Sequence, residues 1–495
     1  MSSLCLLDVY VPLNAQSLSS IFHNSTMADS QILRPTTEEI LEECPRFRIL
    51  VVGRSGVGKS SLINHVFGVD LAIVSHRIRG ECNIEQEITS EQNPRFVLHD
   101  SMGFEPGQTQ TYDTAKAFLV SRGEGAAPKD RVHAIWLCIQ VPYAGGRVFE
   151  TGDEEFLKLA DEFKVPIIVV FTQFDKLMSA VEKNLTDKDL QKSESKIDAL
   201  VNKRADEEFK KTCLPPLRRI NRKLSYARTS ELGKWPTPSE RATATVVELV
   251  STTQTLLEGT PWFLSAISQR ASARAKIDVS IRVGMKKYWR GLASSTHFPG
   301  FKLETCLAAI HVDIIASWNF NDPDNLLNSE PFLTQMKEIS QLVIPDELEV
   351  KSWFKNAEKL QPLIGVGAAV ATQFPAAAPV VIPVIAVIGL SAMFIAWFAS
   401  VYERTAEVLR FFMGYIVDLT LVMDHLFLAL LPGQLPRRLT AVDINLALEN
   451  YKKLDVAAVH TKIRKYAKTS SFKKIYRSNN AEKEVKDLIK THRAR

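Results

Sequence analysis

The stretch Gly53-Arg54-Ser55-Gly56-Val57-Gly58-Lys59-Ser60 fits the phosphate-binding pattern G-x-x-x-x-G-K-[ST] at every fixed position. It follows an apolar run, 47–52, that is typical of a buried strand, and it precedes 60–67, which is typical of a helix. In this context the glycines let backbone N–H groups surround phosphate oxygens at a helix N-terminus. The stretch therefore predicts a nucleotide-binding domain rather than a chance glycine-rich turn.

The same pattern assigns roles to individual residues. Lys59 is expected to neutralise charge on the β- and γ-phosphates, and the Ser60 hydroxyl is expected to ligate Mg²⁺. The residues predicted to contact the nucleotide here are Gly53, Ser55, Gly56, Val57, Gly58, Lys59, Ser60 and Ser61.

A second motif lies at the end of the strand-like run 96–100. There the sequence reads Asp100-Ser101-Met102-Gly103, a D-x-x-G pattern some forty residues beyond the glycine-rich loop. This placement predicts that Asp100 holds Mg²⁺ through water. It also predicts that the Gly103 amide contacts the γ-phosphate.

A third motif, Thr172-Gln173-Phe174-Asp175, follows the strand-like run 165–171. It matches the base-reading pattern [N/T]-K-x-D, with glutamine in place of lysine. The Asp175 carboxylate can accept hydrogen bonds from both N1–H and the N2 amine of guanine, a donor pair that adenine lacks. The alternative interpretation is an aspartate that caps a helix after the strand.

The last contact with the base is predicted at Ser230. The short strand-like run 224–227 leads into Arg228-Thr229-Ser230, and this loop is expected to face the guanine O6. Ser265-Ala266 is closer to the usual sequence S-A-K, but it comes too late in the chain for a compact domain.

The three motifs, in this order and spacing, resemble the translation-factor-related class of P-loop GTPases. Within that class the chain is similar to fungal G-domain-containing proteins with an Era-like, 50S ribosome-binding GTPase-like domain, notably over 97–107. The resemblance covers 46–258. It implies GTP and GDP as ligands with Mg²⁺, hydrolysis of GTP, and a three-layer α/β/α G domain, and it leaves open a homodimer through the G domains.

The chain departs from the pattern of this class in the elements that support hydrolysis. A switch threonine is expected in the middle of 74–89, but no threonine lies there. Ser75 comes too early in this segment and Thr89 too late. Phe104 and Glu105 stand where many small GTPases carry a water-positioning glutamine. No residue is assigned to position the attacking water, so intrinsic hydrolysis is expected to be slow or to use a group supplied in trans.

Composition limits the remaining possibilities. A chain of 495 residues with net charge +5 is expected to form two or three folded domains. Residues 437–495 carry 16 Lys and Arg against 6 Asp and Glu, so this tail is basic and suits an anionic membrane face or nucleic acid. A solvated helical surface is the alternative. No base-reading nucleic-acid module is recognised. The six single cysteines favour a reducing compartment over a disulfide framework or a zinc site.

An uncharged run from Leu363 to Tyr402 predicts contact with a membrane. Its part 384–401 is about long enough to span a bilayer. A buried helix of a helical domain is the alternative. The next apolar segment, 408–431, carries one polar stripe and is expected to pack on the helical domain or to lie in the membrane interface. Positive charge beyond the run predicts a cytoplasmic tail.

These observations divide the chain into five parts. They predict a leader over 1–45 with a short helix at 37–43, a G domain over 46–258, a helical region over 259–360, apolar helical segments over 361–431, and a basic helical tail over 432–495. The predicted function is that of a slow GTPase switch at the cytoplasmic face of a membrane. The alternatives are a GTP-binding scaffold that does not hydrolyse, and an ATP-using P-loop enzyme.

Overall fold

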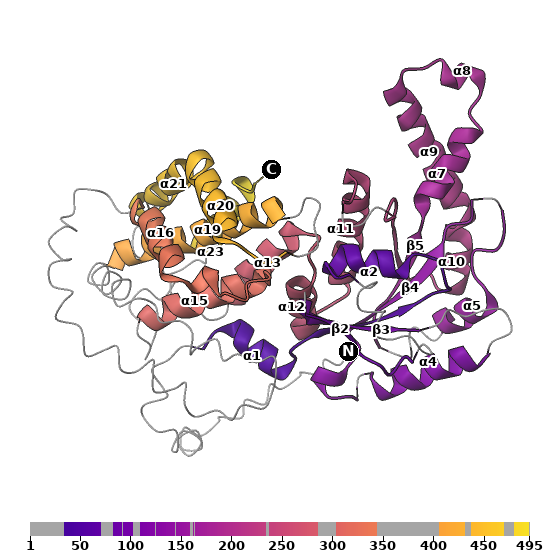
Figure 1. Ribbon diagram of the computed structural model, residues 1–495, viewed down its shortest axis with the longest axis horizontal. Helices are drawn as coiled ribbons and strands as arrows, with labels where there is room; N and C mark the ends of the chain where they lie inside the picture. Colours follow the sequence, from indigo (N-terminus) through magenta and orange to yellow (C-terminus); the bar gives the residue numbers. More distant parts are fainter. Residues whose placement is uncertain are drawn as a thin grey trace, which may run out of the picture.

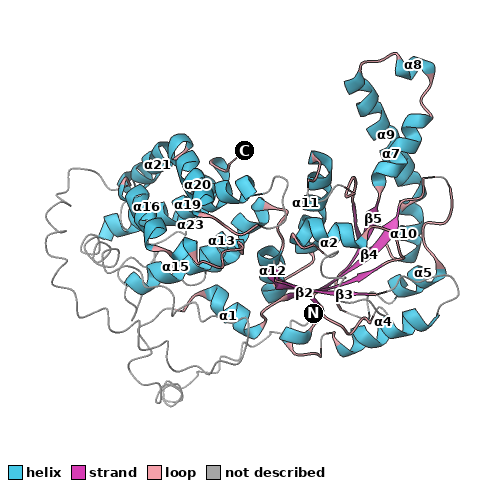
Figure 2. Ribbon diagram, viewed as in Figure 1, coloured by secondary structure: helices cyan, strands magenta, loops and turns pink. Residues whose placement is uncertain are grey.

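The computed structural model describes most of the chain between Arg34 and Ala494. The described ranges are 34–70, 83–91, 93–101, 109–123, 125–143, 145–158, 162, 164–233, 237–285, 303–343, 405–430, 437–469 and 480–494. All the described strands lie in one half of the molecule, and the described elements of the other half are helices (Figure 2).

A six-stranded sheet forms the centre of the first half. Its strand order is β2-β3-β1-β4-β5-β6, with β2 antiparallel to β3 and every other pair parallel. The strands are β1 (Phe47–Val52), β2 (Ile88–Ser90), β3 (Asn93–Asp100), β4 (Ala134–Gln140), β5 (Ile167–Thr172) and β6 (Ser225–Arg228). β1, β4 and β5 are buried along almost their whole length, as expected for parallel strands covered on both faces.

Helices cover both faces of this sheet, which gives the predicted three layers (Figure 1). One hydrophobic cluster joins the sheet to α2 (Lys59–Phe67), α11 (Glu240–Thr255) and α12 (Gly259–Ser268). The other cluster joins the opposite face to α4 (Thr109–Ser121), α5 (Thr151–Lys158), α7 (Phe174–Lys183), α9 (Glu194–Thr212) and α10 (Leu214–Ile220). A 3₁₀ turn, η2 (Pro128–Asp130), precedes β4.

The charged segment that follows α7 forms two helices. The short α8 (Asp187–Leu190) and the longer α9 are separate helices, because the backbone of Ser193, the residue before α9, is extended rather than helical. Together with α7 these helices form an arm that extends away from the sheet (Figure 1). The residues at the tip of this arm are mostly exposed.

The second half is a helical domain with a single hydrophobic core. Its elements are α13 (Ala273–Met285), α15 (Leu303–Trp318), η3 (Leu326–Asn328), α16 (Glu330–Gln341), α19 (Thr405–Leu430), α20 (Ala441–Leu454), α21 (Val456–Thr469) and α23 (Asn480–Thr491). The basic tail expected over 432–495 therefore does not stand apart. Apolar residues of its helices, such as Leu448, Val459 and Val485, are fully buried in the same core as α15.

The predicted boundary at residue 258 also shifts. α12 is apolar along its length and packs with the G-domain core through Leu264 and Ile267, and α13 adds Ala275 and Val279 to that core. Other residues of α13, such as Ile277, belong to the helical-domain core. The two domains therefore share α13, because opposite faces of this helix are both apolar.

α19 is long and apolar enough, by length and composition, to cross a membrane, but 94% of its apolar window is buried inside the protein. Asp418, one residue of its polar stripe, is paired within the core. Asp418 accepts hydrogen bonds from Tyr451 Oη at 2.5 Å and Ser340 Oγ at 3.2 Å, and His460 Nε2 lies 3.0 Å from its carboxylate. α19 is thus the central helix of this domain, as the packing interpretation of 408–431 expects. The run 363–402 lies outside the described residues.

The short helix α1 (Thr36–Glu43) precedes β1 and packs on α15. Asp313 of α15 is fully buried and accepts hydrogen bonds from the backbone N–H groups of Thr36 (3.0 Å) and Thr37 (2.7 Å) and from the Thr37 hydroxyl (2.6 Å). A carboxylate at this position satisfies the free N–H groups of a helix start. Asp313 therefore ties the start of the G domain to the helical domain.

Replacing Asp313 by alanine is expected to lower the free energy of unfolding by about 1–3 kcal/mol, because the start of α1 loses its acceptors. Asp313→Asn, which keeps one acceptor oxygen, is the control and is expected to lose less. Denaturant unfolding of the full chain measures both variants. Wild-type stability in the alanine variant would contradict this role.

Candidate nucleotide-binding site

The glycine-rich loop connects the carboxyl end of β1 to α2 and lies against β4. A Cβ atom on Gly53 would lie 2.7 Å from the Cys138 carbonyl oxygen, so only glycine fits this close approach. Lys59 opens α2, and its Nζ donates to the carbonyl oxygens of Gly53 at 2.6 Å and Arg54 at 3.4 Å. Its ammonium group therefore lies over the loop, where the pattern predicts phosphate.

Asp100 comes to the same place from the neighbouring strand. It is the last residue of β3, it pairs in register with Val51, and its Oδ1 lies 3.8 Å from Lys59 Nζ. Burial raises the pKa of Asp100, and the Lys59 ammonium opposes this shift. Ser60 lies in the first turn of α2 and is exposed. Ser60 and Asp100 thus flank the loop from two elements and offer hard oxygen atoms of the kind that Mg²⁺ binds, and their role as Mg²⁺ ligands stays a prediction.

The base-reading motif touches this loop directly. Thr172 ends β5, and Gln173 adopts a left-handed backbone conformation at the start of α7 with φ 58°. Its side-chain Nε2 donates to the Gly56 carbonyl oxygen at 2.8 Å. Glutamine in place of lysine therefore still holds the base-reading segment against the phosphate-binding loop.

Asp175 is fixed by the loop that follows β6. Its Oδ1 accepts the backbone N–H of Glu231 at 2.9 Å, and the Phe174 N–H donates to the Thr229 carbonyl oxygen at 3.0 Å. Within the described part of the chain, Asp175 Oδ2 makes no hydrogen bond. One carboxylate oxygen is thus positioned by the backbone while the other stays free for a ligand.

The predicted loop 228–230 therefore lies beside the motif. Ser230 is buried, and its backbone N–H donates to Thr245 Oγ1 of α11 at 3.3 Å. Ser265 and Ala266 instead are buried residues of α12, a helix that packs on one face of the sheet. The contact between Ser230 and the guanine O6 stays a prediction.

Several buried polar atoms at this end of the sheet have no hydrogen-bond partner among the described residues. They are Ser101 Oγ, Gln173 Oε1, Thr229 Oγ1 and Ser230 Oγ. Buried polar groups are almost always hydrogen-bonded in folded proteins. Their gathering around the three motifs fits a polar ligand such as a nucleotide.

The structure thus brings most of the sequence-predicted residues together. Gly53 to Ser61, Asp100, Thr172, Gln173 and Asp175 converge at the carboxyl ends of β1, β3 and β5. Val57 is buried in the core, which leaves its backbone for ligand contact. Gly103, Phe104, Glu105 and most of 74–89 lie outside the described residues. The sequence did not indicate Glu231, because a backbone N–H leaves no residue signature.

His99, which precedes Asp100 in β3, is a buried histidine that contacts Arg48 of β1 and the segment before β2. Arg48 Nη1 lies 2.9 Å from His99 Nε2, and His99 Nδ1 lies 2.7 Å from the Ile84 carbonyl oxygen. A guanidinium can only donate and a carbonyl can only accept, so His99 is neutral with its proton on Nδ1. Burial, and then the Arg48 charge, lower the pKa of His99 to about 4.

This histidine predicts a loss of stability in acid. An unfolded histidine has a pKa of about 6.5, so the unfolded chain takes up protons first as the pH falls. The contribution of neutral His99 is complete above pH 6.5 and is lost progressively toward pH 4, by about 2 kcal/mol at pH 5. Denaturant unfolding from pH 7 to pH 5 measures it, and His99→Gln should flatten the profile by this amount. An unchanged slope would contradict the assignment.

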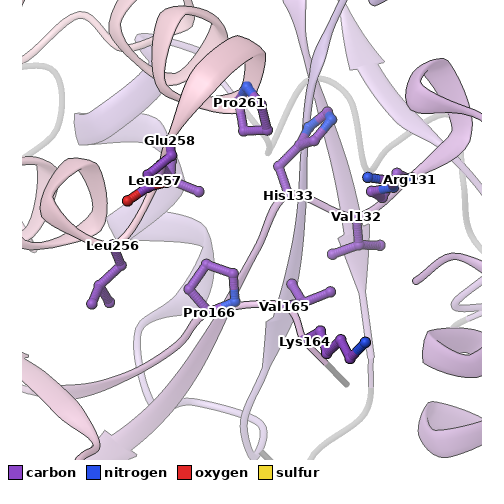
Figure 3. A pocket seen from close by; sticks show the side chains of 10 residues that line it. All are labelled: Arg131, Val132, His133, Lys164, Val165, Pro166, Leu256, Leu257, Glu258 and Pro261. Atoms are coloured by element: carbon purple, nitrogen blue, oxygen red, sulfur yellow. The ribbon is translucent and has the colours of Figure 1, made fainter. Parts of the chain in front are cut away.

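A cavity of about 220 Å³ lies at the amino ends of the strands, opposite the nucleotide-binding site (Figure 3). His133 and Pro166, which directly precede β4 and β5, line it together with Leu257 and Pro261. Ligands of open α/β sheets bind at the carboxyl ends of the strands. This cavity at the amino ends is therefore separate from the nucleotide-binding site.

The fold and the site together define a P-loop GTPase domain. Residues 48–173 match the family described as 50S ribosome-binding GTPase, and residues 326–495 match a domain of unknown function (DUF8505). The chain is 33% identical over 163 residues to GTPase Der of Deinococcus deserti, which is 32% of this chain and 33% of that protein. The chain thus spans about a third of the length of this curated relative.

The chain contains a GTPase domain that binds guanine nucleotide, with a helical domain after it. The three motifs fall inside the aligned family or directly beside it, since Asp175 lies two residues beyond its end.

Proposed function

We propose that this protein is a GTP-hydrolysing switch with a slow intrinsic rate that acts at the cytoplasmic face of a membrane. The observation that carries guanine selectivity is the Asp175 carboxylate, whose Oδ1 is held by the Glu231 N–H and whose Oδ2 has no hydrogen-bond partner among the described residues. Lys59 binds the β- and γ-phosphates. Ser60 and Asp100 hold Mg²⁺, which neutralises phosphate charge when it is bound.

The slow rate is inferred from the residues after Asp100. Phe104 occupies a position where a glutamine orients water in many GTPases, and a phenyl ring has no hydrogen-bonding group for this task. Membrane action is inferred from the uncharged run 363–402 and from the basic tail 437–495, in which helix α21 carries four Lys and Arg and no Asp or Glu.

Calorimetric titration of the full chain with GTP, GDP and ATP, with and without Mg²⁺, tests nucleotide binding. Tight, Mg²⁺-dependent and guanine-selective binding is the expected result, whereas a preference for ATP would favour a P-loop enzyme of another kind. Co-sedimentation with vesicles that contain anionic lipid tests the membrane. Protein that stays in the supernatant at low salt would contradict membrane action.

A second candidate function is a GTP-binding scaffold without turnover, in which nucleotide supports structure or dimerisation through the G domains. Phe104 and the missing threonine of 74–89 favour it. Multiple-turnover phosphate release decides between the two functions. Its absence at high protein concentration and with lipid would select the scaffold.

A further inference from the structure

The loop between β4 and α5, residues 141–150, borders the nucleotide-binding site on two sides. It begins against the base-reading segment. The Val141 N–H donates to the Thr172 carbonyl oxygen at 3.0 Å, and the Lys176 ammonium lies 5.7 Å from the centre of the Tyr143 ring.

The same loop ends against the phosphate-binding loop. Val148 and Phe149 are buried in the core of the G domain and fix the end of the segment. The next residue, Glu150, places its carboxylate 3.5 Å from Nη1 of Arg54, which is the second residue of the phosphate-binding loop. Both ends of the β4–α5 loop are therefore anchored to segments that bind the nucleotide.

Between these anchors the loop turns through two glycines and presents an arginine. Gly145 and Gly146 have φ angles of 83° and 117°, a region that favours glycine. Arg147 follows and is exposed, and it makes no hydrogen bond or ion pair with any described residue. Arg54 is different because Glu150 neutralises it. Among the described residues Arg147 is thus an unpaired cation, on a turn three residues before Glu150, whose carboxylate contacts the phosphate-binding loop.

We propose that Arg147 donates hydrogen bonds to the transferring γ-phosphoryl group in the transition state of GTP hydrolysis on the same chain and stabilises the charge that develops there. This inference rests on the proposed function. In the reaction a water oxygen bonds to the γ-phosphorus and the bond from phosphorus to the β–γ bridging oxygen breaks. The products are GDP and inorganic phosphate, and one water proton is released. The planar guanidinium matches the γ-phosphate oxygens.

Such an arginine explains how a domain with Phe104 in place of a water-positioning glutamine could still turn over GTP. Arginines in this role contribute roughly 10³–10⁵-fold to the rate of phosphoryl transfer to water. The contribution is electrostatic and arises in the transition state, so it changes the rate and leaves the affinity for GTP nearly unchanged.

Single-turnover GTP hydrolysis by the full chain tests the proposal. Arg147→Ala is expected to lower the rate by roughly 10³-fold while GTP affinity stays within about twofold of wild type. Arg147→Lys keeps the charge but loses the planar fork, and a loss of at least tenfold is expected. Arg219→Ala removes an exposed arginine of α10 that has no ion-pair partner among the described residues, and it is the matched control that should keep the wild-type rate.

A second readout does not depend on turnover. GDP with aluminium fluoride mimics the transferring phosphate, and its binding is followed by the fluorescence of a labelled GDP. Arg147→Ala should bind GDP as wild type does but lose the response to aluminium fluoride. An alanine variant that keeps this response, or that loses GTP affinity in parallel with rate, would overturn the proposal. If the alanine variant does not fold, the lysine variant carries the same two readouts.

The outcomes separate this inference from the proposed function. Wild-type protein that binds GTP but never hydrolyses it would remove the function itself. Hydrolysis by wild type at the same rate as by Arg147→Ala would remove only the role of Arg147. The rate per site should also be independent of protein concentration, and a rate that rises with concentration would overturn the same-chain arrangement.

Discussion

Replacement of Lys59 by alanine is expected to lower the affinity for GTP by about 10³-fold. The ammonium group lies over the phosphate-binding loop, within 2.6 Å of the Gly53 carbonyl oxygen. Two charge-assisted hydrogen bonds to phosphate oxygens are each worth about 1.5–3 kcal/mol, and both disappear in the variant. Calorimetric titration with GTP and GDP measures the loss.

The same substitution is expected to weaken Mg²⁺ binding. Lys59 is the cation that counteracts the raised pKa of the buried Asp100. Without it the Asp100 carboxyl group holds its proton more strongly, and a protonated carboxyl is a poor ligand for Mg²⁺. The dependence of GTP affinity on Mg²⁺ should therefore flatten.

Lys203→Ala is the matched control, because Lys203 is an exposed lysine on the arm helix α9. It should bind GTP as wild type does. Retained GTP affinity in Lys59→Ala would show that the nucleotide binds elsewhere, and the amino-end cavity beside His133 would then be the place to examine.

The sequence predicts the G domain well because its signals are local. A strand such as 47–52 and the turn that follows it contain within fourteen residues both the apolar run and the glycines that phosphate binding requires. The order of the three motifs then predicts which strand ends lie close together, since parallel strands have their carboxyl ends on the same side of the sheet.

The helical domain is harder to predict because its contacts are distant in sequence. Asp418 of α19 is polar, and its spacing indicates a stripe that faces water or an interface. Its partners Ser340, Tyr451 and His460 lie 78, 33 and 42 residues away. No local pattern reveals these pairings, so the sequence alone could not distinguish a solvated stripe from a buried network.

The candidate site likewise combines side chains that sequence patterns mark with backbone groups that no pattern marks. Lys59 and Asp175 are marked by patterns of residue types. The Glu231 N–H that holds Asp175 and the Gly56 carbonyl oxygen that holds Gln173 belong to the backbone, which every residue shares. The positions of such groups follow only from the fold.

Replacement of Asp175 by asparagine is expected to remove the preference for guanine. Guanine offers two donors, N1–H and the N2 amine, to a carboxylate that can only accept. An asparagine amide pairs with N1–H through its oxygen but turns its NH₂ group toward the N2 amine, where two donors face each other. A site built for hydrogen bonding rejects a mismatched partner by up to about 10⁴-fold. We expect GTP affinity to fall by at least about 10²-fold.

Xanthine nucleotides provide the stringent readout, because xanthine carries an oxygen acceptor where guanine carries the N2 amine. Asp175→Asn should therefore bind XTP more tightly than GTP, whereas loss of both ligands would indicate a collapsed site. Asparagine also keeps an oxygen for the Glu231 N–H, so the loop after β6 should stay in place. Wild-type selectivity in Asp175→Asn would mean that Asp175 only begins helix α7 and that the base is read by other groups.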